Sequence, residues 1–230
     1  MPRRICVSIG KRETESVIAA AEKVKDLADV IEIRLDYLAS PAVGRLAAEI
    51  TLPLIFTNRP IWEGGHFAGS EAERIAPLAE AVQMQAAYID LELTAPHASR
   101  KFLQARLAGT NTRLILSSHD FNQTADFPRL ADIVTKMQES GADIGKLVTT
   151  AQKPADNLRL LKTLEIAADK KFPLIAFCMG RHGAISRVAS CDFGGYMTYC
   201  SLDDMDCTAP GQITLDNMMR IFALTRDDRP

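Results

Sequence analysis

Short apolar runs rich in β-branched residues recur along the chain, and each is followed by a longer stretch whose apolar residues lie three and four positions apart. The short runs predict strands and the longer stretches predict helices, so their alternation favours parallel βα units. The eight predicted strands are 4–8, 30–35, 53–57, 88–93, 113–117, 143–148, 173–178 and 195–200. The clearest predicted helices are 16–25, 71–87, 127–140 and 155–169.

Eight βα units in 230 residues predict an α/β fold, a (β/α)8 TIM barrel that forms a single domain over residues 1–230. A doubly wound open sheet would usually have fewer strands. No G-x-G-x-x-G motif follows the first predicted strand, so a Rossmann cofactor site is disfavoured. No low-complexity tract or linker marks a domain boundary.

Composition narrows the classes of function. The 27 Lys and Arg residues nearly balance 29 Asp and Glu residues, which leaves a formal charge of −2. We therefore expect no nucleic-acid partner and no anionic membrane partner. Hydrophobic residues make up 47% of the chain, as in ordinary globular proteins, and no apolar run approaches the roughly 18 residues of a membrane helix.

The cysteines and histidines point to a reducing compartment and away from a metal site. The five cysteines are odd in number and show no C-x-x-C spacing, and the apolar stretch after the two N-terminal arginines is too short for a signal peptide. We predict reduced thiols in the cytoplasm. The four histidines form no H-x-x-x-H or H-E-x-x-H pair, so no metal site is expected.

Charged residues interrupt the second predicted strand. Alternation places Glu32, Arg34 and Asp36 on one face of this strand and apolar residues on the other. In a parallel barrel the apolar face meets the helices, so Glu32 and Arg34 are expected to point into the barrel. They form either an interior ion pair that only fixes structure or part of a functional site.

Lys146 lies in the sixth predicted strand and shares a face with Ile144 and Val148. Burial disfavours the ammonium and is expected to lower the pKa of Lys146, which would make it a nucleophile able to condense with a ketone or aldehyde. The alternative is a lysine that reaches the strand end and pairs with a carboxylate.

His119 follows the fifth predicted strand, next to the strand that carries Lys146. A neutral imidazole suits proton transfer near pH 7, and an adjacent carboxylate could orient it. A lone histidine is also often an ordinary packed or capping residue. The other histidines, His66, His97 and His182, fall in predicted loops or helix starts.

Three loops after predicted strands carry ligand-binding groups. Arg59 could hold a carboxylate in bidentate fashion, and Thr208 and Gln212 offer a hydroxyl and an amide. The loop from Gly180 to Arg187 adds two further arginines. Any one of these loops could be a turn with an exposed arginine, but all of them follow strands of one barrel.

Six segments, in this order, resemble the signatures of type I 3-dehydroquinate dehydratase, a shikimate-pathway enzyme. They are EIRLD (32–36), TNRP-x-x-EGG (57–65), SSHDF (117–121), GADIGK (141–146), MG-x-x-G-x-ISR (179–187) and TAPGQ (208–212). The resemblance spans nearly the whole chain. It implies a (β/α)8 barrel, usually a homodimer, that uses no metal or organic cofactor and acts on 3-dehydroquinate as its small-molecule substrate.

The resemblance implies a role for each matching residue. Lys146 would form the Schiff base, His119 would be the general acid and base, and Glu63 would support the histidine. The residues that would bind substrate are Arg187, for its carboxylate, Glu32 and Arg34, for its ring hydroxyls, and Arg59, Thr208 and Gln212. The reaction would be a hydro-lyase dehydration to 3-dehydroshikimate on the route to chorismate and the aromatic amino acids.

The chain departs from the family pattern at two places. The family commonly has Phe-Arg-Thr or Phe-Arg-Ser where this chain has Asn58-Arg59-Pro60, and often Ser at the position of Thr208. Both changes keep the important functional group, so they affect substrate positioning rather than the reaction.

Two other functions remain open at this point. A class I aldolase would also use a barrel lysine, but for sugar phosphates it would need a phosphate site after strands seven and eight, where this chain has Arg187 and the 209–212 loop. A barrel kept only as a binding module would be expected to have lost the lysine, histidine or arginine.

Overall fold

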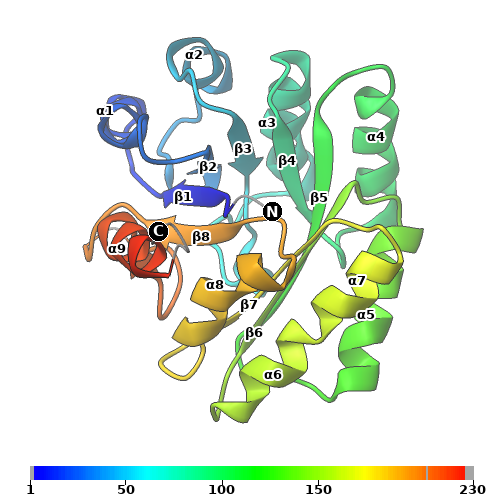
Figure 1. Cartoon of the computed structure of the whole chain (residues 1–230). Coiled ribbons are helices and arrows are strands. Elements are labelled where there is room, and N and C mark those ends of the chain that lie inside the picture. The colour runs from blue at the N-terminus through cyan, green and yellow to red at the C-terminus, as the bar shows by residue number, and fades with distance from the viewer. Residues whose placement is uncertain (1–2, 206, 226–230) are drawn as a thin grey trace.

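The structure, a computed structural model, describes residues 3–205 and 207–225. Its parallel strands form one sheet that curls round on itself, and helices cover the outer face (Figure 1). The strands are β1 Ile5–Ile9, β2 Val30–Arg34, β3 Leu54–Thr57, β4 Tyr88–Glu92, β5 Arg113–Asp120, β6 Ile144–Thr150, β7 Leu174–Met179, β8 Thr198–Ser201 and β9 Ile213–Thr214. The predicted α/β barrel is thus confirmed.

Helices connect successive strands on the outside of the barrel (Figure 1). The α-helices are α1 Thr14–Val24, α2 Val43–Glu49, α3 Glu71–Gln83, α4 His97–Leu107, α5 Phe127–Glu139, α6 Ala155–Leu161, α7 Thr163–Asp169, α8 Ala184–Ala189 and α9 Leu215–Leu224. Three short 3₁₀ helices are η1 Leu35–Tyr37, η2 Ile61–Glu63 and η3 Ser190–Phe193. Within the described residues, no helix combines the length and apolar character needed to cross a bilayer.

Each of the eight predicted strands matches one of β1 to β8, with differences at the ends. β5 continues to Asp120, three residues beyond the predicted end, because Ser118, His119 and Asp120 pair with β6. The polar residues there had concealed the continuation of the strand. β9 was not predicted; it is a two-residue strand that pairs with β8.

Two predicted helices end or break earlier than expected. The helix predicted over 71–87 ends at Gln83, because Gln85 adopts a left-handed φ of 58° and the N–H of Ala86 bonds back to the carbonyl of Ala81. The helix predicted over 155–169 is interrupted at Lys162, where the Thr163 hydroxyl donates to the backbone carbonyl of Leu160 (2.6 Å).

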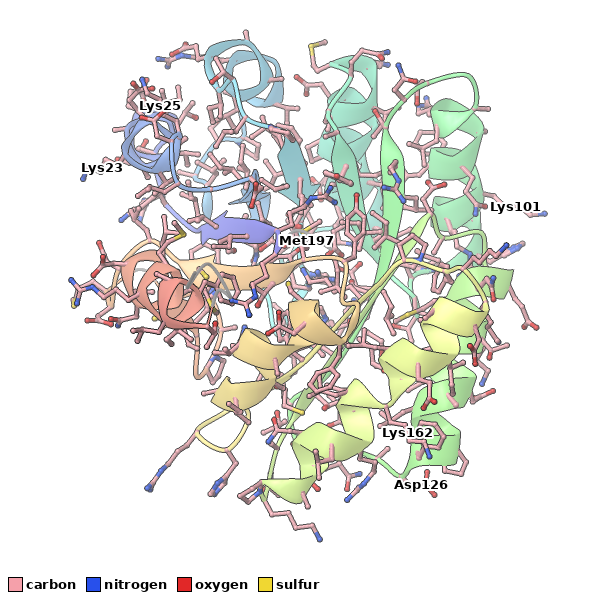
Figure 2. All side chains as sticks on the ribbon, viewed as in Figure 1. Lys23, Lys25, Lys101, Asp126, Lys162 and Met197 are labelled. Carbon is pink, nitrogen blue, oxygen red and sulfur yellow. The ribbon has the colours of Figure 1, made fainter. Side chains whose placement is uncertain are left out.

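The two faces of the sheet carry different side chains. Ile31, Ile33 and Leu35 pack between β2 and the outer helices, as predicted from alternation. The lower part of the barrel interior, toward the amino ends of the strands, is apolar and includes Met197. In Figure 2 Met197 lies near the middle of the molecule, whereas Lys23 and Lys101 extend outward from α1 and α4.

The hydrogen-bonded order of the sheet runs from β7 through β6, β5, β4, β3, β2 and β1 to β8 and β9. Over the described residues, β7 and β8 are therefore not neighbours in a continuous ladder. They are joined near their amino ends by the Tyr196 N–H, which donates to the Leu174 carbonyl (2.8 Å). Helix α8 bonds both to β8 and to the loop after it: the Thr198 hydroxyl donates to the Arg187 carbonyl (2.7 Å), and the Arg187 guanidinium donates to the Pro210 carbonyl (3.4 Å).

Candidate active site

One cavity lies at the carboxyl ends of the barrel strands, the end at which barrel enzymes carry their active sites. All nine side chains selected from the sequence line it, which are Glu32, Arg34, Arg59, Glu63, His119, Lys146, Arg187, Thr208 and Gln212. They come from four strands or the segments directly after them (β2, β3, β5 and β6), from α8, and from the loop after β8. The barrel therefore brings together residues that are far apart in the sequence.

Lys146 points into the barrel from β6, on the face that it shares with Ile144 and Val148, as predicted. The side chain is buried, and its Nζ lies 3.0 Å from Glu32 Oε1 on β2 and 3.0 Å from Asp90 Oδ2 on β4. Lys146 thus pairs with two carboxylates, and its side chain forms part of the cavity wall.

The direction of the Lys146 pKa corrects the prediction. Burial alone would lower the pKa, but Asp90 and Glu32 outweigh it, and the pKa is raised. Lys146 is therefore an ammonium at neutral pH and must lose a proton before it can attack a carbonyl. The two carboxylates that hold the ammonium are equally placed to stabilise a cationic imine.

Glu32 and Arg34 do not form the ion pair that was considered from the sequence. Glu32 accepts hydrogen bonds from Ser8, Thr57 and Lys146. Arg34 instead forms two hydrogen bonds with Asp36, at 2.8 and 2.6 Å. The correction arises because the strand ends at Arg34 and Asp36 lies in η1, which turns its carboxylate back onto the guanidinium.

His119 is oriented by Glu63. Its Nδ1 lies 2.9 Å from Glu63 Oε1, and its backbone N–H donates to the same oxygen at 3.1 Å. The neighbouring Asp120 has another role, since it accepts from the backbone N–H groups of Asn122 and Gln123 at 2.9 and 3.0 Å. Glu63, at the end of η2, is thus the carboxylate that fixes the imidazole.

Burial shifts both members of this pair toward their uncharged forms. Desolvation, with Arg59 and Lys146 nearby, lowers the pKa of His119 well below its usual value. Desolvation raises the pKa of Glu63 to about 8. At neutral pH His119 is a neutral imidazole, and a proton on Nδ1 directed at Glu63 leaves Nε2 free to accept a proton.

Arg59 is not the open bidentate clamp that the sequence suggested. One Nη donates to Glu92 (2.6 Å) and Ser117 (2.7 Å), and the other donates to Asp90 (2.8 Å). These carboxylates outweigh burial and raise the pKa of Arg59. Arg59 therefore reaches the cavity wall as part of an internal charge network.

Of the Lys and Arg side chains that line the cavity, Arg187 is the one for which the described residues supply no carboxylate partner. It lies in α8, not in a loop as predicted, and is 1% exposed. Its guanidinium stacks over the Phe177 ring, 4.4 Å from the centroid, and one Nη donates to the Pro210 carbonyl at 3.4 Å. Its Nε has no hydrogen-bond partner among residues 3–205 and 207–225, and burial lowers its pKa to about 10.

The loop after β8 contributes Thr208 and Gln212. The Gln212 side-chain oxygen accepts from the Thr208 N–H (2.8 Å), and the Thr208 hydroxyl donates to Ser8 Oγ (3.0 Å). Ser8 in turn donates to Glu32, the partner of Lys146. The same loop is held from its other side by the Gly180 N–H, which donates to the Pro210 carbonyl at 3.2 Å.

Several functional groups were missed in the sequence. Asp90 and Glu92 on β4 hold Lys146 and Arg59, and they alternate with apolar residues as Glu32 does on β2. The same parity argument applied to β4 would have found them. Ser8 and Tyr199, which also contact this network, carry no comparable signal, because small polar and aromatic residues are ordinary in strands.

No group of three or more histidine, cysteine, aspartate or glutamate residues is arranged to hold a metal ion in the part of the chain that the structure describes.

Comparisons with known proteins give one consistent result. Residues 5–229 match the family model described as Type I 3-dehydroquinase. The 3-dehydroquinate dehydratase of Desulfotalea psychrophila is 52% identical over 221 residues, which cover 96% of this chain and 97% of that protein. A bifunctional 3-dehydroquinate dehydratase/shikimate dehydrogenase of Arabidopsis thaliana is 34% identical over 98% of this chain and 38% of its own length.

A solved structure agrees with these sequences. The type I 3-dehydroquinate dehydratase of Clostridium difficile, whose structure carries covalently modified comenic acid, superposes with a TM-score of 0.87 at 27% identity, covering 96% of this chain and 91% of that one. Since both the family model and a close relative cover nearly the whole chain, the chain belongs to the type I 3-dehydroquinase family.

Proposed function

We propose that this protein dehydrates 3-dehydroquinate to 3-dehydroshikimate through an imine on Lys146. The observation that carries this proposal is the arrangement of three groups around one cavity. A buried lysine is held by two carboxylates, a neutral histidine lies on the adjacent strand, and a buried arginine without a carboxylate partner lines the same space. These are an amine, a base and an anion site.

The first half of the reaction uses Lys146. Once deprotonated, Nζ adds to the C3 carbonyl, and loss of water leaves a cationic imine that acidifies the C2–H. The positive charge then lies where the ammonium was, beside Glu32 and Asp90. The carboxylates therefore stabilise the intermediate without having to move.

The second half uses His119. Nε2 takes the C2 proton, and the electron pair of the broken C–H bond forms an enamine. The C1–O bond then breaks, and the hydroxyl leaves as water with a proton supplied by His119. Hydrolysis of the conjugated imine releases the product and returns Lys146. Glu63 supports both steps by fixing the imidazole through Nδ1 (2.9 Å).

The remaining residues position the substrate in this proposal. Arg187 holds the carboxylate, because it is a buried cation with no carboxylate partner in the part of the chain that the structure describes. Glu32 and Arg34 contact the ring hydroxyls, and Thr208 and Gln212 close over the ligand. Arg59 contributes mainly by holding Asp90 and Glu92 in place.

The expectations about assembly and location belong to the same proposal. We place the enzyme in the shikimate pathway, as a single-domain homodimer in the cytoplasm. Its five cysteines are free thiols, four of them buried, which is in keeping with a reducing compartment. Sedimentation equilibrium at micromolar concentration tests the homodimer, and a monomer mass would refute it.

The family relationship and the site both disfavour the sugar-phosphate aldolase. Helix α8, which follows β7, brings one buried arginine to the cavity, and the loop after β8 places a proline-glycine turn beside it, which suits a carboxylate. If a phosphorylated ketone were turned over and 3-dehydroquinate were not, the aldolase hypothesis would be preferred. Tight binding of 3-dehydroquinate without conversion would instead favour the binding module.

Borohydride trapping tests the proposed function. The protein is incubated with 3-dehydroquinate and sodium borohydride, and the intact mass and peptide map are measured. We expect a reduced adduct on Lys146. Lys146→Ala should form no adduct, and His119→Ala should lose most turnover but still form some. Lys101→Ala, at an exposed site on α4, is the matched control. Full turnover by Lys146→Ala would refute the mechanism.

A further inference from the structure

Tyr199 is a buried titratable residue that the proposed mechanism does not use. It lies on β8, is 3% exposed, and lines the cavity. Its ring centroid is 4.2 Å from Lys146 Nζ, so the lysine lies over the face of the ring. A cation at this distance from an aromatic face is attracted by the negative charge of the π system.

The ring occupies a side of Lys146 that the carboxylates leave open. An ammonium has three N–H groups, and among the described residues two carboxylates, Glu32 and Asp90, bond to this one. We propose that the aromatic face of Tyr199 is the third wall of a cage that holds Lys146 in its cationic forms, the ammonium and the imine. Tyr199 is thus a positioning residue for the imine; the inference rests on the proposed function and extends it.

The ring, and not the hydroxyl, carries this role. The Tyr199 hydroxyl is buried and has no hydrogen-bond partner within the described residues. An unpaired buried hydroxyl contributes nothing to holding Lys146 and costs free energy on folding. The contributions of the Tyr199 ring and of its hydroxyl can therefore be tested separately, with substitutions that keep the ring.

A second aromatic residue fixes the ring and extends the arrangement to Arg187. The Phe177 ring lies 5.8 Å from the Tyr199 ring at an angle of 48°, and Phe177 itself is covered by the guanidinium of Arg187 at 4.4 Å. The four side chains form one chain of contacts, Lys146 to Tyr199 to Phe177 to Arg187. Each cation faces its own ring, so the aromatic pair sets the positions of amine and guanidinium relative to each other.

The charged and titratable groups that act on Lys146 come from several elements. They are Asp90 on β4 and Glu32 on β2, which raise its pKa, Arg59 after β3, which lowers it, and His119 on β5 and Cys6 on β1, which interact with it in turn. The Tyr199 ring favours the cation over the neutral amine. Removing the negative charge from the face of the Tyr199 ring should therefore lower the pKa of Lys146.

A shape-matched pair of substitutions isolates this contribution. Tyr199→Phe keeps the electron-rich ring without the hydroxyl. Pentafluorophenylalanine at position 199, introduced by amber suppression, keeps the shape but reverses the charge distribution of the ring face. The same two replacements at Tyr88, in the apolar lower part of the barrel, are the controls. Thermal unfolding of each variant verifies that it is folded.

The titration of Lys146 is measured without substrate. Each protein is methylated with formaldehyde and cyanoborohydride across pH 6 to 11, and peptide mapping gives the rate at Lys146, with the exposed Lys170 as internal reference. We expect Tyr199→Phe to match the wild type. Pentafluorophenylalanine should lower the midpoint by about 0.4 to 1.5 pH units, because a cation–π contact favours the cation about 2- to 30-fold.

Three outcomes overturn the inference. They are a folded pentafluorophenylalanine variant with an unchanged midpoint, a Tyr199→Phe midpoint that falls as far as the fluorinated one, and an equal shift from the Tyr88 controls. Borohydride trapping of the wild type with 3-dehydroquinate is run in parallel. A wild type that forms no adduct refutes the proposed function alone, since the methylation profile requires no 3-dehydroquinate.

Discussion

Arg187 differs from the other Lys and Arg side chains that line the cavity. Arg34 pairs with Asp36, Arg59 pairs with Asp90, and Lys146 pairs with Glu32, whereas Arg187 has no carboxylate partner among the described residues. A buried cation without a carboxylate partner costs free energy. An anion bound beside the guanidinium would offset that cost, which is the role proposed above for the carboxylate of the substrate.

Asp90 forms ion pairs with both Lys146 and Arg59, so its replacement should affect both side chains. Asp90→Asn keeps the shape but removes the charge, which lowers the pKa of Lys146 and weakens its hold on the imine. We expect a loss of turnover of at least 10-fold and a fall of about 1–3 kcal/mol in the free energy of unfolding. Steady-state kinetics and urea unfolding measure both, and unchanged values would contradict the role of Asp90.

Glu63 makes stability depend on pH. Its pKa in the folded protein, about 8, is raised above the unfolded value, so its contribution is present in full below about pH 4.5 and is lost as pH rises toward 8. Glu63→Gln has no carboxyl group to titrate at this position, so the variant should not lose this stability as the pH rises. We expect the variant to gain about 2 kcal/mol or more relative to wild type between pH 5 and pH 8.5 in urea unfolding. A difference that is constant with pH would refute the shift.

The sequence could predict those site residues whose charged side chains are unusual in an apolar strand. Lys146 and Glu32 were found because a charge in an apolar strand needs an explanation. The pairing of Asp36 with Arg34 was not predicted, and Glu63 was assigned to His119 only through the family resemblance, because both carboxylates reach their partners through turns whose geometry the residue pattern does not contain. The pKa of Lys146 was predicted in the wrong direction because Asp90 had been overlooked.

At the scale of elements, η2 places Glu63 and ends at a glycine. Gly64 adopts a φ of 77°, and a Cβ there would lie 2.2 Å from the ring of Phe121, which stacks beside His119. We expect Gly64→Ala to lower the free energy of unfolding by about 1–2 kcal/mol for the backbone alone. It should also reduce kcat at least 10-fold, because both Glu63 and Phe121 must move.

The matched control for Gly64→Ala is Asp126→Ala. Asp126 caps α5 by accepting from the Arg129 N–H (3.2 Å), away from the cavity. Its loss should cost about 1 kcal/mol of stability and leave kcat unchanged. Equal losses of kcat in the two variants would mean that general destabilisation, and not the placement of Glu63, explains the effect.

Strands were predicted better than their connections. β1 to β8 are short buried strands of a parallel sheet, rich in apolar and β-branched residues, and this is the pattern from which strands are most readily predicted. Arg187 was assigned to a loop because α8 has only six residues, too few to show a helical period. β9 is shorter still and exists only because it lies against β8.

At the scale of the whole molecule, the barrel interior has an apolar lower part and a charged upper part. Ile115 and Ile175 lie in the lower part, whereas Lys146 and its carboxylates occupy the layer above. Ile115→Ala should cost about 2–5 kcal/mol in unfolding free energy. We expect its pH profile of turnover to keep the wild-type midpoints, as measured on folded protein. A shifted midpoint would show that the two parts are coupled.

The loop at 207–212 touches both ends of the cavity at once. Through Thr208 and Ser8 it connects to Glu32 at the amine end, and through Pro210 it connects to Arg187 at the anion end. The loop therefore couples the two ends of the cavity. A displacement of its backbone would change the surroundings of the Lys146 amine and of the Arg187 guanidinium together.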